Sequence, residues 1–186
     1  MILDAAVEFF AERGFSAQTR ELAAVLGISE PLIYNYFPSK VDLIHEVFHD
    51  VIESRWDADW VDRLKVRDAP LRERLIAFYE SYLEAIDDGV WIRIVMYASL
   101  DGLDMTRRYI TGKVDDLMGV IATESAAEAH VETDVDLEHM WQLQSTLVYY
   151  LVRKHIHLTA VSPERSEVIA MAVDAYLDGL PRPSST

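Results

Sequence analysis

Apolar side chains recur every three or four residues along most of this chain, which is the period of an α-helix that buries one face. Strand-like alternation of apolar and polar residues is absent, and only 7 glycines and 6 prolines interrupt the sequence. Long helices should therefore fill most of the chain. The pattern predicts an all-α protein of about nine helices: two short ones within residues 19–37, and others near residues 2–12, 41–60, 70–86, 90–100, 105–127, 137–158 and 163–179.

Residues 19–40 have the pattern of two short helices joined by a turn. Thr19 is expected to cap the first helix with its hydroxyl, and Gly27 to end that helix in a left-handed conformation. Ser29 should cap the second helix, with Pro31 inside its first turn. The segment therefore predicts a helix-turn-helix.

Residues 90–100 are apolar on almost every side except at Arg93, which predicts a helix buried in the middle of a bundle. A buried arginine needs an anionic partner, either a protein carboxylate or an acidic ligand. The helix expected from 105 to 127 contains Gly112 and Gly119, which permit close approach or bending. Residues 128–136 are polar and should form a loop in which Asp134 or Asp136 caps the next helix.

The composition is that of a globular protein. The chain has 186 residues, 51% of them hydrophobic, with no cysteine and therefore no disulfide or thiolate metal site. No stretch has the apolar length of a membrane span, and the first residues lack a secretory pattern. We expect a cytoplasmic protein that does not associate with membranes.

The segment TRELAAVLGISEPLIYNYFPSK resembles the DNA-binding domain of the TetR family of transcriptional repressors. The likeness continues upstream through ILDAA, FF and ERGF, and downstream to Leu43. It implies a helix-turn-helix DNA-binding domain over residues 1–46, joined to a helical ligand-binding and dimerisation domain over residues 47–186. The function implied is repression at a palindromic double-stranded DNA operator, with release by a small-molecule effector whose identity the sequence does not indicate.

The resemblance also implies which residues contact DNA. The residues expected at base edges or at the groove floor are Ser29, Pro31, Leu32 and Asn35, and those expected at phosphates are Thr19, Tyr34, Tyr36 and Lys40. Arg20 is also expected to contact DNA. Packing in the core is the alternative role for Tyr34 and Tyr36. Hydroxyl and ammonium groups can donate to phosphate oxygens, and an asparagine can form two hydrogen bonds with adenine. Glu30 departs from this chemistry, because it would repel a nearby phosphate unless it accepts from a cytosine amine.

The charge balance favours a different interpretation. The formal net charge is −15, and residues 1–50 contain three basic against eight acidic side chains. A nucleic-acid binder is expected to carry a basic face. Members of the family commonly have a basic arm before the first helix, so either such an arm precedes Met1 or that contact is not made. The alternative function is a helical ligand-binding or interaction module with weak or lost DNA binding.

A third class, the enzymes, has little support in the sequence. His45, Glu46 and His49 match the H-E-x-x-H pattern of zinc proteases. They lie inside the helix expected after residue 40, which the TetR resemblance already explains. Asp87 and Asp88 are expected to be solvated caps or loop charges. We expect no catalytic residues, no metal site and no cofactor.

Two further features concern residues 47–186. An aromatic and methionine-rich set could line an effector pocket together with Arg93, although core packing is the simpler role for each member: Tyr82, Trp91, Met96, Tyr97, Met118, Trp141 and Tyr149. The last two predicted helices carry Tyr149 and the small residues Ala170, Ala172 and Ala175. By the resemblance, these two helices form the homodimer contact.

Overall fold

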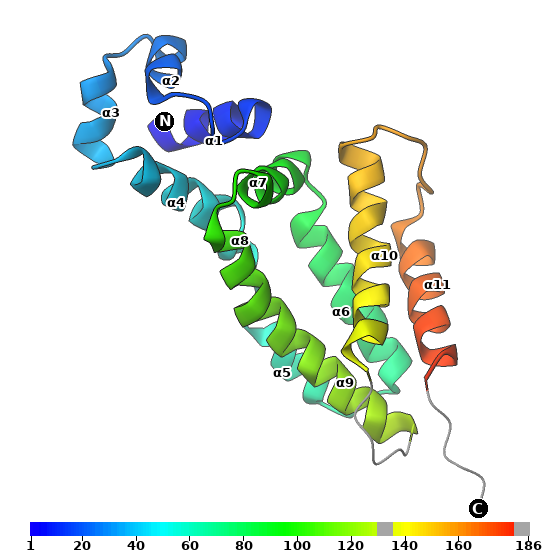
Figure 1. Ribbon diagram of the computed structural model, residues 1–186. Coiled ribbons are helices and arrows are strands. Elements are labelled where there is room, and N and C mark those ends of the chain that lie inside the picture. The colour runs from blue at the N-terminus through cyan, green and yellow to red at the C-terminus, as the bar shows by residue number, and fades with distance from the viewer. Residues whose placement is uncertain (130–135, 181–186) are drawn as a thin grey trace, which may run out of the picture. The chain divides into compact units, whose positions relative to one another are not determined.

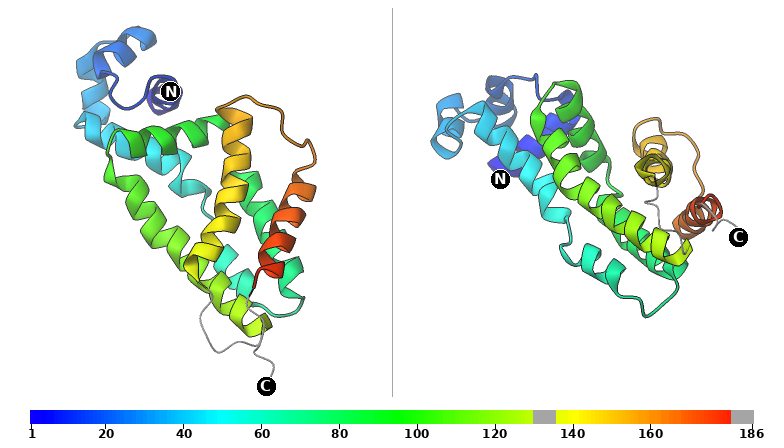
Figure 2. Two further views of the ribbon diagram at one scale, coloured as in Figure 1. Left: turned by 45° about the vertical axis from the view of Figure 1, so that its right-hand side comes forward. Right: turned by 60° about the horizontal axis from the view of Figure 1, so that its bottom comes forward.

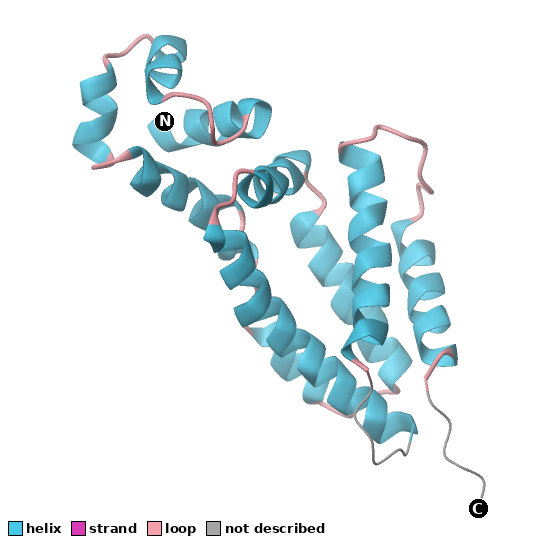
Figure 3. Ribbon diagram, viewed as in Figure 1, coloured by secondary structure: helices cyan, strands magenta, loops and turns pink. Residues whose placement is uncertain are grey.

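The computed structural model describes residues 1–129 and 136–180, and all regular structure in these ranges is helical (Figures 1 and 3). The prediction of an all-α fold is confirmed. The helices are α1 (Ile2–Arg13), α2 (Thr19–Leu26), α3 (Glu30–Tyr36), α4 (Lys40–Val51), α5 (Asp59–Lys65), α6 (Leu71–Ile86), α7 (Gly89–Leu100), α8 (Asp104–Tyr109), α9 (Asp115–Ala129), α10 (Leu137–His155) and α11 (Arg165–Asp178).

The chain forms two compact units. Unit 1 contains residues 1–56 and 88–110, and unit 2 contains residues 57–87 and 111–186. Helices α7 and α8 therefore pack with the N-terminal helices, although they come much later in the sequence. The domain boundary expected after residue 46 stays a prediction.

The core of unit 1 is built from the apolar faces of α1, α4 and α7. Phe10 is fully buried, and its ring lies 5.2 Å from that of Phe15. Next to this cluster, Gly14 ends α1 with φ 77° and faces the ring of Tyr97 on α7. The carboxylate of Asp101, directly after α7, accepts hydrogen bonds from the backbone N–H groups of Phe15 at 2.9 Å and Ser16 at 3.1 Å. The turn after α1 is therefore held by α7.

Helix α4 is shorter than the sequence pattern predicts. The expectation of a continuous helix past Trp60 is wrong, because α4 ends at Val51 and a 3₁₀ turn follows at Glu53–Arg55. The side chain of Asp57 then accepts from the backbone N–H of Asp59 at 2.9 Å, a local bond that competes with helix continuation. Helix α5 starts anew and buries Trp60, whose indole N–H donates to Ser81 Oγ at 2.9 Å.

The core of unit 2 lies among α5, α6, α9, α10 and α11. Figure 2 shows α6, α10 and α11 side by side, and α11 packs on both of the others. Helix α9 begins after a π-helical turn at Ile110–Val114, which contains Gly112. The expected cap at Asp136 is confirmed by a 3.0 Å bond from the backbone N–H of Glu138. Asp134, the other candidate, lies outside the described residues.

Two further expectations need correction. Helix α7 is buried on one side only: Leu100 is 80% exposed, and Arg93 is half-buried rather than buried. Arg93 therefore does not require the anionic partner that a buried arginine would need. Helix α11 begins at Arg165, two residues after the proline expected at its first position.

Candidate nucleic-acid interface

Helices α2 and α3 form the expected helix-turn-helix. Gly27 ends α2 in the left-handed conformation, with φ 65° and ψ 28°, and its N–H points to the carbonyls of Ala23 and Ala24. The N–H of Ile28 donates to Ala23 O at 3.0 Å and completes the turn. Ser29 is the N-cap of α3, as predicted, although its hydroxyl makes no capping bond.

Thr19 has a different position from the one expected. The N-cap of α2 is Gln18, and Thr19 is the first helical residue, only 4% exposed. Its Oγ1 donates to Glu30 Oε1 at 2.6 Å and lies 2.8 Å from the hydroxyl oxygen of Tyr34. The three side chains join the start of α2 to α3. Sequence analysis missed this connection, because the partners are 11 and 15 residues away from Thr19.

The outer side of α3 is available to a partner. Ile33 is completely buried and anchors the helix, whereas Tyr36 is 68% exposed and Leu32 is 37% exposed. We call the α3 surface the set of exposed residues on this helix and its cap: Ser29, Pro31, Leu32, Tyr34, Asn35 and Tyr36. All the predicted base-edge residues lie on it.

Two cations flank the α3 surface. Arg20 is exposed on α2 and Lys40 is half-exposed at the start of α4, and neither pairs with a carboxylate within the described ranges. Arg13, by contrast, reaches Glu21 at 3.3 Å and lies over the ring of Phe9. Among the basic residues of positions 1–47, Arg20 and Lys40 are therefore the ones available to a polyanion.

A sequence model described as "Bacterial regulatory proteins, tetR family" matches residues 2–47, which include this whole helix-turn-helix. Residues 2–47 therefore have the sequence of the TetR-family DNA-binding domain. Among curated proteins, no significant match was found. DNA-binding transcriptional regulation is the function that the family assignment supports.

Solved structures show the same fold over nearly the whole chain. PfmR, a TetR family transcriptional regulator from Thermus thermophilus, is 21% identical with a TM-score of 0.69, over 97% of this chain and 99% of PfmR. A TetR family regulator from Pseudomonas syringae pv. tomato is 20% identical with a TM-score of 0.66, over 96% of this chain and 93% of its own. The TetR fold therefore extends beyond the matched N-terminal segment.

The zinc-protease pattern lies on α4 and overlaps the end of the TetR match. Its three residues, His45, Glu46 and His49, are all exposed on α4. In residues 1–129 and 136–180, no group of three or more potential ligands among His, Cys, Asp and Glu could hold a metal ion.

None of the helices in the same ranges combines the length and hydropathy needed to cross a bilayer.

The residues predicted to line an effector pocket are spread over both compact units. Tyr82 and Met118 are buried in unit 2, where Trp141 is half-buried and Tyr149 is 56% exposed. The other four lie on α7 in unit 1: Trp91 is buried, and Arg93, Met96 and Tyr97 are half-buried. A common pocket for these eight residues remains a prediction.

The interior of unit 2 contains polar groups that the sequence analysis did not select. The amide of Gln144 donates to Tyr82 Oη at 3.0 Å, but its oxygen Oε1 is buried without a partner. The hydroxyl of Tyr79 is also buried and unpaired, and burial raises its pKa well above the ordinary value. Gln144 could have been found in the sequence, because it occupies a core position of α10 between Met140 and Leu147.

A second set of hydroxyls lies in the same core. Tyr176 Oη lies 2.7 Å from Ser125 Oγ and donates to Met140 Sδ at 3.1 Å. Burial raises the pKa of Tyr176 to about 12, so the phenol stays neutral at physiological pH. The core of unit 2 is thus apolar in its bulk but contains neutral hydrogen-bonding groups.

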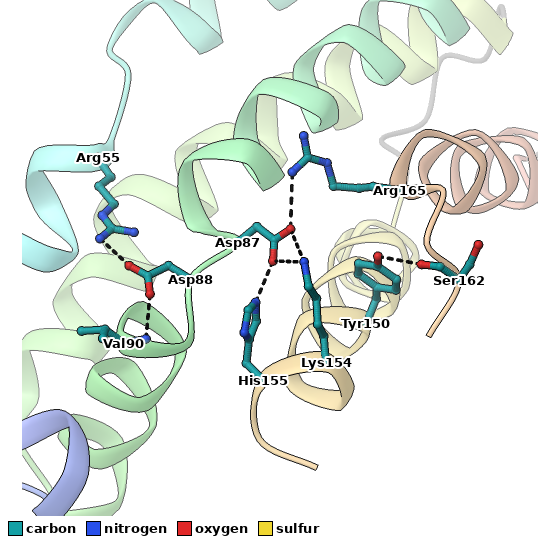
Figure 4. Close-up of polar contacts among 9 residues, drawn as sticks. All are labelled: Arg55, Asp87, Asp88, Val90, Tyr150, Lys154, His155, Ser162 and Arg165. Carbon is teal, nitrogen blue, oxygen red and sulfur yellow. Dashed lines mark hydrogen bonds and ion pairs between the residues drawn. The ribbon is translucent and has the colours of Figure 1, made fainter. Parts of the chain in front are cut away.

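Two acidic residues at the end of α6 bind different partners (Figure 4). Asp87, expected to be solvated, is 13% exposed and accepts from Lys154 at 2.7 Å and His155 at 2.7 Å, with Arg165 at 3.4 Å. Burial pushes the pKa of Asp87 upward, but the hydrogen bonds from Lys154 and His155 outweigh it, and the net pKa is lowered. Asp88 caps α7 as expected, and it also binds Arg55 at 2.6 Å.

Glu124 on α9 is a buried carboxylate held by two arginines. It accepts from Arg67 Nε at 2.8 Å and Nη2 at 3.0 Å, and from Arg74 Nη1 at 2.9 Å. The bonds from Arg67 lower the pKa of Glu124; burial opposes them, and the bond from Arg74 adds to them. Arg74 also donates to the carbonyls of Leu64 and Ala69, so the cluster fastens the α5–α6 connection to α9.

Proposed function

We propose that this TetR-family regulator is a cytoplasmic repressor that binds a palindromic DNA operator as a homodimer and leaves it when a small-molecule effector binds. The observation that carries the DNA-binding part is the α3 surface, which exposes Pro31, Leu32, Asn35 and Tyr36 between the cations Arg20 and Lys40. Polar and apolar groups on a short helix can read base edges, while the flanking cations hold phosphates. With so few cations, binding should depend only moderately on salt.

Dimerisation through α10 and α11 is supported by apolar side chains that these helices leave exposed. Met171 on α11 is 67% exposed and Tyr149 on α10 is 56% exposed. A groove of about 230 Å³ runs between the two helices, with Leu143, Ala172 and Ala175 in its walls. Aromatic and methionine side chains are enriched at interfaces, and a second copy of these helices would cover them. A twofold dimer in turn requires a palindromic operator.

Effector binding in unit 2 is supported by the unpaired polar atoms in its core. The hydroxyl of Tyr79 can donate, and Gln144 Oε1 can accept. A buried polar atom without a partner is unfavourable, so a ligand that supplies the missing bonds would gain affinity there. The effector expected is a neutral, largely apolar molecule with both a donor and an acceptor. Release from DNA then requires that the effector favour a conformation with lower operator affinity.

Selection from a random DNA library, followed by mobility-shift titration of the enriched sequence, tests the DNA-binding part. We expect a palindrome to be enriched, and Lys40→Ala and Tyr36→Ala to weaken its binding about tenfold or more. Lys65→Ala is the matched control, because it removes a cation from α5, which is not part of the helix-turn-helix. Failure of the full chain to enrich any sequence at low salt would favour the alternative, a helical ligand-binding or interaction module without DNA affinity.

A further inference from the structure

We infer that Glu30 and Thr19 fix the direction of the hydrogen bond made by Tyr34, so that its hydroxyl meets DNA only as an acceptor and selects a base that carries an exocyclic amine. The inference rests on the proposed operator binding and names one determinant of its specificity. It replaces the expectation that Thr19 and Tyr34 hold phosphates, and the expectation that Glu30 repels a phosphate unless it accepts from a cytosine amine.

The direction follows from the number of protons in the chain of contacts. The Thr19 hydroxyl has one proton, whereas an ionised carboxylate can only accept. Thr19 Oγ1 lies 2.6 Å from Glu30 Oε1, so the threonine proton points to Glu30. Thr19 can then only accept in its 2.8 Å contact with Tyr34. The phenolic proton of Tyr34 therefore points to Thr19, inward between α2 and α3.

The surroundings keep this arrangement in place. Thr19 is 4% exposed, so water has little access to compete for its hydroxyl. Glu30 lies in the first turn of α3, on the same helix as Tyr34. Ile33, completely buried, anchors the helix that carries Tyr34, and Tyr34 remains 38% exposed. The three side chains form a relay whose outer end is Tyr34.

The relay determines which DNA groups Tyr34 can bind. Phosphate oxygens only accept hydrogen bonds, and so do guanine O6 and N7 and thymine O4, so a tyrosine oxygen whose proton is already used cannot pair with them. Adenine N6 and cytosine N4 donate in the major groove, and either can pair with the lone pairs of Tyr34. The expected preference is adenine or cytosine over thymine or guanine on the contacted strand, at one position of each half-site.

The test compares operator variants at each half-site position, using the full-length protein and the sequence enriched by the wild type. We expect one position at which adenine or cytosine binds roughly tenfold more tightly than thymine or guanine, the size of a single good base contact. Tyr34→Phe should reduce this ratio to about one. Glu30→Ala and Thr19→Val should do the same, because each leaves the phenolic proton free to point outward.

Tyr36→Phe is the matched control, since it removes a phenolic hydroxyl from the α3 surface outside the relay. Because Tyr36 is expected at a phosphate, this variant should weaken binding to every operator variant alike and so leave the base ranking unchanged. Circular dichroism melting checks that each variant is folded. If Tyr34→Phe keeps the ranking, or if Glu30→Ala and Thr19→Val keep it while Tyr34→Phe loses it, the relay does not set specificity. If the wild type enriches no sequence, the proposed function itself has failed instead.

Discussion

Asp87 and Asp88 are adjacent in the chain, yet their carboxylates are bound within different compact units (Figure 4). Asp87 binds Lys154 and His155 of α10 and Arg165 of α11, all in unit 2. Asp88 binds Arg55 and caps α7 in unit 1. The passage of the chain from one unit to the other is therefore anchored on both sides of a single peptide bond.

Asp87→Asn should destabilise the protein by roughly 1–3 kcal/mol, because the site lies between exposed pairs, which contribute little, and buried pairs, which are costly to break. Three cationic or basic groups would lose the negative charge that they share. Urea unfolding followed by circular dichroism measures the change. Asp174→Asn is the control: Asp174 pairs with Arg72 but is 47% exposed, and we expect a much smaller effect. Equal losses in the two variants would contradict the special role of Asp87.

Stability should fall in acid because the pKa values of Glu124 and Asp87 are lowered in the folded protein. Their contribution is complete above the unfolded-state values of 4.5 and 3.8 and is lost as the pH falls through the lower folded values. Urea midpoints measured from pH 7 to pH 3 should therefore drop below about pH 4.5.

Glu124→Gln should make this acid dependence shallower, as well as lowering stability at neutral pH. Glu80→Gln, at an exposed position of α6, should keep the wild-type dependence. An unchanged slope in Glu124→Gln would mean that the arginine cluster does not contribute to acid unfolding.

Gly14→Ala should cost about 1–3 kcal/mol, because the backbone there (φ 77°, ψ 170°) is one that essentially only glycine adopts. An added Cβ would also lie 3.0 Å from Tyr97 Cδ1. Gly27→Ala is the comparison: its φ is also positive, but nothing lies within 4 Å of the added atom, so we expect about 1 kcal/mol. The double variant Gly14→Ala with Tyr97→Ala separates the two causes, since only the steric part can be relieved.

Met171→Glu should convert the dimer to monomer and weaken operator binding, because it places a charge in the proposed α10–α11 interface. Sedimentation velocity at micromolar concentration measures the state. Leu100→Glu introduces the same charge at another exposed apolar position, 80% exposed on α7, and should remain dimeric. A wild-type protein that sediments as a monomer would rule out this interface.

The features that the sequence predicted correctly depend on local chemistry. Gly27 and Ser29 mark the turn of the helix-turn-helix because left-handed backbone and N-cap preferences belong to single residues. The all-α class follows from a period repeated over many turns. The end of α4 at Val51 could not be predicted from the sequence, because no glycine or proline lies there. Asp57 and Trp60 mark instead where α5 starts, since the Asp57 carboxylate accepts from the N–H of Asp59 and Trp60 is buried.

Contacts between distant segments account for the remaining differences. Thr19 has the residue type of a helix cap, and only the folded chain brings it to Glu30 and Tyr34. The sequence predicts Asp87 to be a solvated loop charge, because its basic partners are 67 to 78 residues away and cannot be recognised from the local pattern. The sequence gives a partial signal for Gln144 and Glu124, because each is a polar residue at a core position of its helix. That signal shows burial but not the partner.

The contact of Asp101 with the turn after α1 limits how this regulator could be rebuilt. An exchange of DNA specificity between related regulators would naturally cut the chain after residue 47, where the sequence match ends. A graft made there would leave behind Asp101, which holds the N–H groups of Phe15 and Ser16, and Tyr97, which covers Gly14. The transferable module is discontinuous in sequence: its first helix needs a support that is encoded some 85 residues downstream.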